Sequence, residues 1–92
     1  MDIYEQMAVR IIQSQEEVIG DDAIKEAKKV DGLQIDWGKK TVVIAGDKKK
    51  VIEQLIECYR AMFGQPFIEV CKLTVKDLIS QLPRNDIPLP LI

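Results

Sequence analysis

Apolar and polar residues alternate with the period of an α-helix over the first twenty positions. Asp2 is a favourable N-cap, and Glu5 follows three residues later, as in a capping box. Gly20 suits the left-handed conformation that often ends a helix. The pattern predicts an amphipathic helix between Asp2 and Gly20. Its apolar positions are Ile3, Met7, Ala8, Ile11, Ile12, Val18 and Ile19.

A second, shorter helix is expected directly after that glycine. Asp21 or Asp22 caps it, and apolar residues occupy one side while charged residues occupy the other. We expect this helix to end at Asp31 and Gly32. Its apolar positions are Ala23, Ile24, Ala27 and Val30.

The hydrophobic period then changes from helical to two residues. Leu33, Ile35 and Trp37 alternate with polar residues, which is the pattern of a strand with one buried face. A turn at residues 38–40 is followed by a β-branched run at residues 41–45. These segments predict an antiparallel hairpin.

Two further helices and a tail complete the predicted elements. Asp47 caps a helix whose apolar residues keep helical spacing up to Gly64. Residues 67–71 fit either the start of a helix or a short strand beside the hairpin, but the later spacing favours one helix up to Leu82. Residues 83–92 hold three prolines, so they cannot continue that helix and are expected to form a strap or arm.

The element order predicts an α+β fold, α-α-β-β-α-α, with a two-stranded antiparallel hairpin packed on helices. Ninety-two residues leave room for one hydrophobic core. We therefore expect residues 1–82 to form a small single domain and residues 83–92 to form a proline-rich C-terminal tail. Such a short chain buries only about two-thirds of the surface of its unfolded form, so self-association would stabilise it.

Composition and charge restrict the classes of partner. The chain is 47% hydrophobic and 30% charged with a net charge of −2, which argues against a broad basic face for nucleic acid. A winged helix-turn-helix also pairs helices with a hairpin, but its wing follows a recognition helix, and the second helix here is short and not strongly basic. No segment has the length of a membrane helix or the basic start of a signal peptide, so we expect a cytoplasmic protein.

The residues that catalysis and metal binding need are scarce. The chain has no histidine, which removes the commonest general base and every metal set that uses imidazole. Cys58 and Cys71 are the only nucleophilic thiols, and we expect both to pack as small hydrophobic residues rather than to form a disulfide. We expect no catalytic residue, no metal site and no cofactor.

A run of lysines is the unusual polar feature. Lys48, Lys49 and Lys50 occupy a helix's first turn, where they oppose the helix dipole. An antiparallel hairpin would bring them near Lys28 and Lys29 and form a basic rim. This rim is the candidate site for an anionic ligand, although it lacks the glycine spacing of a phosphate-binding loop. Solvated surface lysines are the simpler interpretation.

Apolar residues near the ends of elements are the candidate protein contacts. Trp37 at the hairpin tip is either the edge of the core or an exposed anchor. The tail either packs on its own domain or lies across another subunit or protein. The candidate interaction residues are Trp37, Ile87, Leu89, Leu91 and Ile92.

These observations lead to two hypotheses about function. The first is a non-catalytic protein-interaction or regulatory module that forms a homo-oligomer or binds another protein through the tail and the last helix. The second is a ligand-sensing domain that binds an anionic small molecule at the lysine rim. An enzyme with Cys58 or Cys71 as its nucleophile ranks third.

Overall fold

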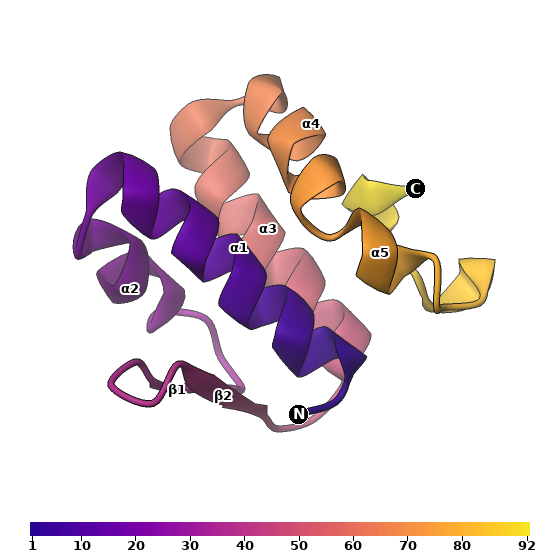
Figure 1. Cartoon of the computed structure of the whole chain (residues 1–92), viewed down its shortest axis with the longest axis horizontal. Helices are drawn as coiled ribbons and strands as arrows, with labels where there is room; N and C mark the ends of the chain where they lie inside the picture. The colour runs from indigo at the N-terminus through magenta and orange to yellow at the C-terminus, as the bar shows by residue number, and fades with distance from the viewer.

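The computed structural model describes residues 1–92 and contains five α-helices and one hairpin (Figure 1). The predicted α+β class and its order of helices and strands are confirmed. The elements are α1 Ile3–Ile19, α2 Asp22–Ala27, β1 Leu33–Asp36, β2 Thr41–Ile44, α3 Lys48–Phe63, α4 Gln65–Thr74 and α5 Lys76–Ile79, followed by the 3-10 turns Arg84–Asp86 and Leu89–Leu91.

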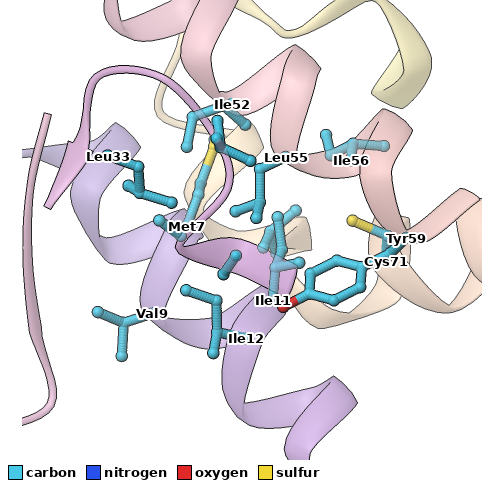
Figure 2. Close-up of a cluster of buried hydrophobic side chains, with 14 of the residues drawn as sticks. Met7, Val9, Ile11, Ile12, Leu33, Ile52, Leu55, Ile56, Tyr59 and Cys71 are labelled. Carbon is cyan, nitrogen blue, oxygen red and sulfur yellow. The ribbon is translucent and has the colours of Figure 1, made fainter. Parts of the chain in front are cut away.

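The core lies where α1 and α3 pack side by side and run in the same direction (Figures 1 and 2). Their first turns meet through an ion pair between Lys48 and Asp2. Tyr59 is fully buried, and its hydroxyl donates a 2.6 Å hydrogen bond to the Ala23 carbonyl, which joins α3 to α2. The buried residues that α1 and α3 contribute at the centre include Met7, Ile11, Ile12, Ile52, Leu55 and Ile56.

Capping explains why the long helices begin and end where they do. Asp2 and Glu5 form the predicted capping box at the start of α1. Asp47 caps α3, because its carboxylate accepts a hydrogen bond from the Lys50 amide. Gly20 ends α1, as predicted, but its φ of 66° and ψ of −143° differ from the left-handed helical conformation that was expected there. Asp21 holds the N-cap position of α2 but makes no side-chain capping bond.

The hairpin is antiparallel, with Leu33 opposite Ile44. It lies along α1, because the second carboxylate oxygen of Glu5 accepts the Ile44 amide at 3.1 Å. Gly32, just before β1, has a φ of 84°, and a Cβ there would lie 2.6 Å from the Ala45 carbonyl oxygen. Only glycine fits this close approach of the two chain segments.

Two predicted helix boundaries are wrong. α2 ends at Ala27, because the amides of residues 29 and 30 bond carbonyls only three residues back and so form tighter turns that lead into β1. The predicted helix up to Leu82 is interrupted at Val75, whose backbone lies at φ −114° and ψ 15°. Residues 67–71, left open between helix and strand, are helical.

The tail folds back on its own chain. Leu91 is 5% exposed and packs where the second 3-10 turn contacts α3 and α4. The Leu89 amide donates a 2.8 Å hydrogen bond to the Glu53 carboxylate of α3. The Tyr4 hydroxyl donates a 2.7 Å bond to the Asp86 carbonyl. Of the two locations considered for the tail, the structure therefore shows the one on its own domain.

No helix combines the length and the apolar character that a bilayer crossing requires.

Candidate interaction surface

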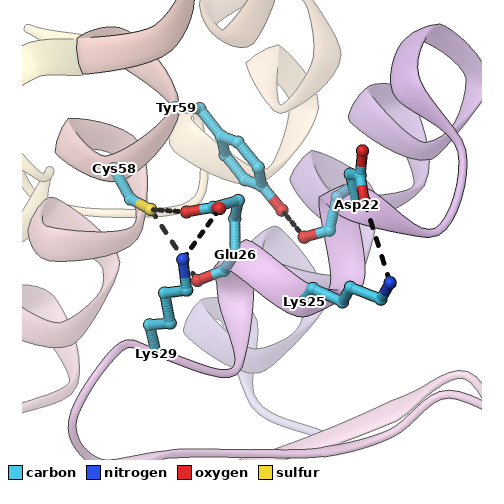
Figure 3. Close-up of polar contacts among 7 residues, drawn as sticks. Asp22, Lys25, Glu26, Lys29, Cys58 and Tyr59 are labelled. Atoms are coloured by element: carbon cyan, nitrogen blue, oxygen red, sulfur yellow. Dashed lines mark hydrogen bonds and ion pairs between the residues drawn. The ribbon is translucent and has the colours of Figure 1, made fainter.

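The five lysines of the candidate anion site do not converge. Lys48 pairs with Asp2 at the start of α1, and Lys49 donates a 2.9 Å bond to the Asn85 carbonyl in the tail. Lys29 instead pairs with Glu26 at 2.9 Å and lies beside Cys58 (Figure 3). Cys58 lies ten residues beyond Lys48 on α3, which corresponds to about 15 Å of helix axis.

The paired lysines are held by carboxylates rather than left free for a ligand. The side-chain hydrogen bond that Lys48 donates to Asp2 raises the pKa of Lys48, and the one that Lys29 donates to Glu26 raises the pKa of Lys29. Lys28 and Lys50 remain exposed on the surface. The predicted rim is therefore split into separate ion pairs and solvated side chains.

Both cysteines lie in surroundings that disfavour the thiolate. Burial, together with the Glu26 carboxylate 3.8 Å from Sγ, raises the pKa of the half-buried Cys58 (Figure 3). Burial raises the pKa of Cys71 to about 12. The Lys29 ammonium beside Cys58 acts to lower the pKa of that thiol, but burial and Glu26 outweigh it, so neither cysteine has the lowered pKa of a reactive thiol. No three His, Cys, Asp or Glu side chains converge in the structure.

Trp37 is bound to α1 through polar contacts. Its indole Nε1 donates a 2.8 Å hydrogen bond to Glu16, and the Lys40 ammonium lies 4.2 Å from the ring centroid. Lys40 also pairs with Glu16 at 3.7 Å. The sequence left open whether Trp37 forms the edge of the core or an exposed anchor. In the structure its indole is half-buried and fixes the hairpin tip to α1.

The candidate contact residues of the tail differ in exposure. Leu91 is buried and unavailable to a partner, and Ile87 is half-buried. Leu89 and Ile92 are exposed. The structure thus leaves two of the four apolar tail residues fully at the surface.

A further exposed apolar surface lies on α4. Val70 is 48% exposed and Leu73 is 74% exposed, and Pro66 is exposed one turn earlier. Spacings of four and three residues put these three side chains on one stripe, which we call the α4 ridge. The opposite side of the helix faces the core with Phe67, Ile68 and Cys71.

A cleft lies on each side of the ridge. One cleft of about 300 Å³ separates α4 from α1, and the exposed Val18 of α1 contributes to its wall. Its lining residues are Ser14, Gln15, Val18, Phe63, Pro66, Phe67 and Val70. The other cleft, of about 450 Å³, lies between α4, α5 and the tail, and its lining residues are Glu69, Lys72, Leu73, Lys76, Ile79 and Leu91.

The charges beside the ridge are distributed unevenly. Glu69, Lys72 and Lys76 all line the larger cleft, and Glu69 lies 4.0 Å from Lys72. The opposite flank, beside Val70, carries no charged residue in its cleft. α4 itself therefore carries charged residues on only one side of the ridge, while Arg10 and Glu17 of α1 line the surface beside Thr74 on the other side.

Searches of protein families, curated proteins and solved structures found nothing that matches this chain. The arrangement of its own surface is therefore the basis for a functional proposal.

Sequence reasoning placed the contact surface on the tail and on the predicted last helix, which extends up to Leu82 and includes α4. It did not identify the α4 ridge within that helix. The signal was present, because Pro66, Val70 and Leu73 have the spacing of a helix stripe. It was obscured because Phe67, Ile68 and Cys71 form a second apolar stripe on the same segment. Only the fold shows which of the two stripes faces the core.

Proposed function

We propose that this chain is a non-catalytic protein-interaction module and that the α4 ridge is its contact face. The observation that carries the proposal is the exposure of Leu73 between two clefts, on a helix whose opposite side is fully engaged with the core. A rigid helix that presents apolar side chains beside grooves is a common way to bind another helix.

The energetic gain from covering the ridge is substantial for a small domain. Complete burial of a Val or Leu side chain contributes about 1.5–3 kcal/mol. In the free chain 48% of the Val70 surface and 74% of the Leu73 surface are still exposed. Roughly half or more of this burial energy is therefore still to be gained when a partner covers the two side chains. Val18, 69% exposed at the edge of the smaller cleft, extends the same apolar surface onto α1.

The structure supports the anionic-ligand alternative less well. Three of its five lysines already contact Asp2, Glu26 or the tail backbone. An anion would have to displace these contacts or bind the two remaining lysines, Lys28 and Lys50. The interaction hypothesis requires no such rearrangement, because Val70 and Leu73 are exposed in the free chain.

Site-specific photo-crosslinking tests the proposal. A photoreactive amino acid replaces Leu73 in the full chain, and the chain is irradiated in the cells that produce it. The matched control carries the same group at Val43, which is 58% exposed on the hairpin. We expect a discrete protein adduct from position 73 and none from position 43. Equal or absent labelling at the two positions would refute the α4 ridge as the contact face.

A further inference from the structure

We propose that the smaller cleft, between α1 and α4, binds a small uncharged aromatic molecule that carries one hydrogen-bonding group. We call this site the α1–α4 cleft, and it consists of the seven lining residues given above. The inference goes beyond the proposed function and does not rest on it, because the ligand enters the cleft beside the α4 ridge and leaves Leu73 uncovered. The observation that carries it is the side chain of Gln15.

Gln15 is a polar residue at a core position. It is the only polar residue that the fold buries, with 5% of its surface exposed. It follows Ile11 and Ile12 at helical spacing on the buried face of α1. Moving an amide out of water is unfavourable unless a hydrogen bond replaces the lost hydration. Packing alone would favour an apolar residue here, so the glutamine needs another explanation.

The Gln15 amide has no hydrogen-bond partner within the protein. The amides of Gln6 and Gln81 donate to backbone carbonyls, but none of the side-chain hydrogen bonds involves Gln15. No side-chain nitrogen or oxygen that is fully enclosed lacks a partner, so the Gln15 amide reaches open space. The α1–α4 cleft is the cleft that Gln15 lines. Its two N–H donors and its carbonyl acceptor are therefore available to a molecule in that cleft.

The remaining wall of the cleft is apolar and partly aromatic. Phe63 at the end of α3 and Phe67 of α4 supply two rings, and Ser14 supplies the only other polar side chain. Aromatic side chains pair favourably with a third ring in offset or edge-to-face arrangements. A mostly apolar wall with a few polar groups is typical of small-molecule sites.

Charge and size restrict the class of ligand further. No lining residue is charged, so an ionised group that entered the cleft would lose its hydration without gaining a counter-ion. The volume of about 300 Å³ is at the lower end of the range for ligand sites. A cavity of about 150 Å³ accommodates one benzene ring. The α1–α4 cleft therefore fits a single substituted ring rather than a large cofactor.

An NMR titration of the ¹⁵N-labelled full chain tests the inference with three probes. Phenol is uncharged at pH 7 and carries a hydroxyl group, benzene lacks the hydroxyl group, and benzoate carries a charge. The side-chain amide of Gln15 has its own pair of signals. We expect phenol to shift these signals with a dissociation constant of about 1 mM, as suits a single ring in an open cleft. Benzene should bind at least about threefold more weakly, because it makes no hydrogen bond, and benzoate should leave the signals unchanged.

Two variants and one further measurement separate the hydrogen bond from general stickiness. Gln15→Leu removes the amide and keeps a side chain of similar size, so it should bind phenol no more tightly than benzene. Gln13→Leu makes the same change at an exposed position of α1 outside the cleft and should keep the preference for phenol. Nuclear Overhauser contacts between phenol and the rings of Phe63 and Phe67 in the wild type locate the ligand without any variant.

Three results would overturn the inference. They are unchanged Gln15 signals with phenol up to about 20 mM, equal binding of benzoate and phenol, and an undiminished preference for phenol in folded Gln15→Leu. The outcome is separate from that of the proposed function. An adduct from position 73 without phenol binding upholds the α4 ridge and excludes the ligand site, and phenol binding without such an adduct has the opposite meaning.

Discussion

The hydroxyl of Tyr59 joins α3 to α2 inside the core, and Tyr59→Phe removes only that oxygen. The hydroxyl lies 2.6 Å from the Ala23 carbonyl, and the side chain is fully buried. Removing a buried hydrogen-bond partner costs about 1–3 kcal/mol, and the aromatic ring retains its packing, so we expect a loss of about 1.5 kcal/mol. For a domain of this size, that loss lowers Tm by about 6–12 °C.

Thermal and urea unfolding, followed by circular dichroism, measure this loss. Tyr4→Phe is the matched control, because the Tyr4 hydroxyl also donates to a backbone carbonyl, that of Asp86, but near the surface where water replaces it. We expect the control to lose no more than about 0.5 kcal/mol. Equal losses for the two variants, or no loss for Tyr59→Phe, would refute the buried tie between α2 and α3.

Three further predictions concern caps, close contacts and thiols. The Asp2 carboxyl is partly desolvated, but bonds from Lys48 and backbone amides outweigh this effect and lower its pKa below the ordinary 3.8. The contribution of this carboxylate to stability is therefore present above about pH 4 and is lost as the pH falls through the lowered pKa. The stability advantage of wild type over Asp2→Asn in urea unfolding should accordingly disappear between about pH 4 and pH 2. Gly32 has a φ of 84°, and a Cβ at this position would lie 2.6 Å from a carbonyl oxygen, so Gly32→Ala should lower the free energy of unfolding by about 3 kcal/mol in the same assay. The control Gly46→Ala, whose Cβ meets nothing within 4 Å, should lower it by about 1 kcal/mol. Cys71, whose pKa burial raises to about 12, should react with iodoacetamide at pH 8 only after the chain is unfolded, and rapid labelling of the native protein would contradict its burial.

Local signals in the sequence were sufficient to predict an element where its ends are determined by neighbouring residues. The capping box of Asp2 and Glu5 and the Asp47 cap are short-range patterns, and both are present in the structure. The hairpin was likewise predictable, because alternation and β-branching act over neighbouring residues. Such interactions do not depend on how distant elements pack.

The features that sequence reasoning missed depend on tertiary contacts. The break at Val75 has no glycine or proline to mark it, and Val75 itself is fully buried. The lysines were expected to share a rim, but Lys48 and Lys49 are drawn to Asp2 and the tail, which are remote in sequence. The tail's position similarly follows from contacts with α3 and α4 that no local pattern encodes.

An NMR comparison of the purified ¹⁵N-labelled chain with the same chain in extract of the cells that produce it tests the central claim most directly, because each backbone amide reports its own surroundings. We expect the changes in chemical shift to concentrate on α4, Gln65–Thr74, and to leave the hairpin amides of Leu33–Asp36 and Thr41–Ile44 unchanged. Identical spectra, or changes confined to the hairpin or the tail, would contradict the α4 ridge as the contact face.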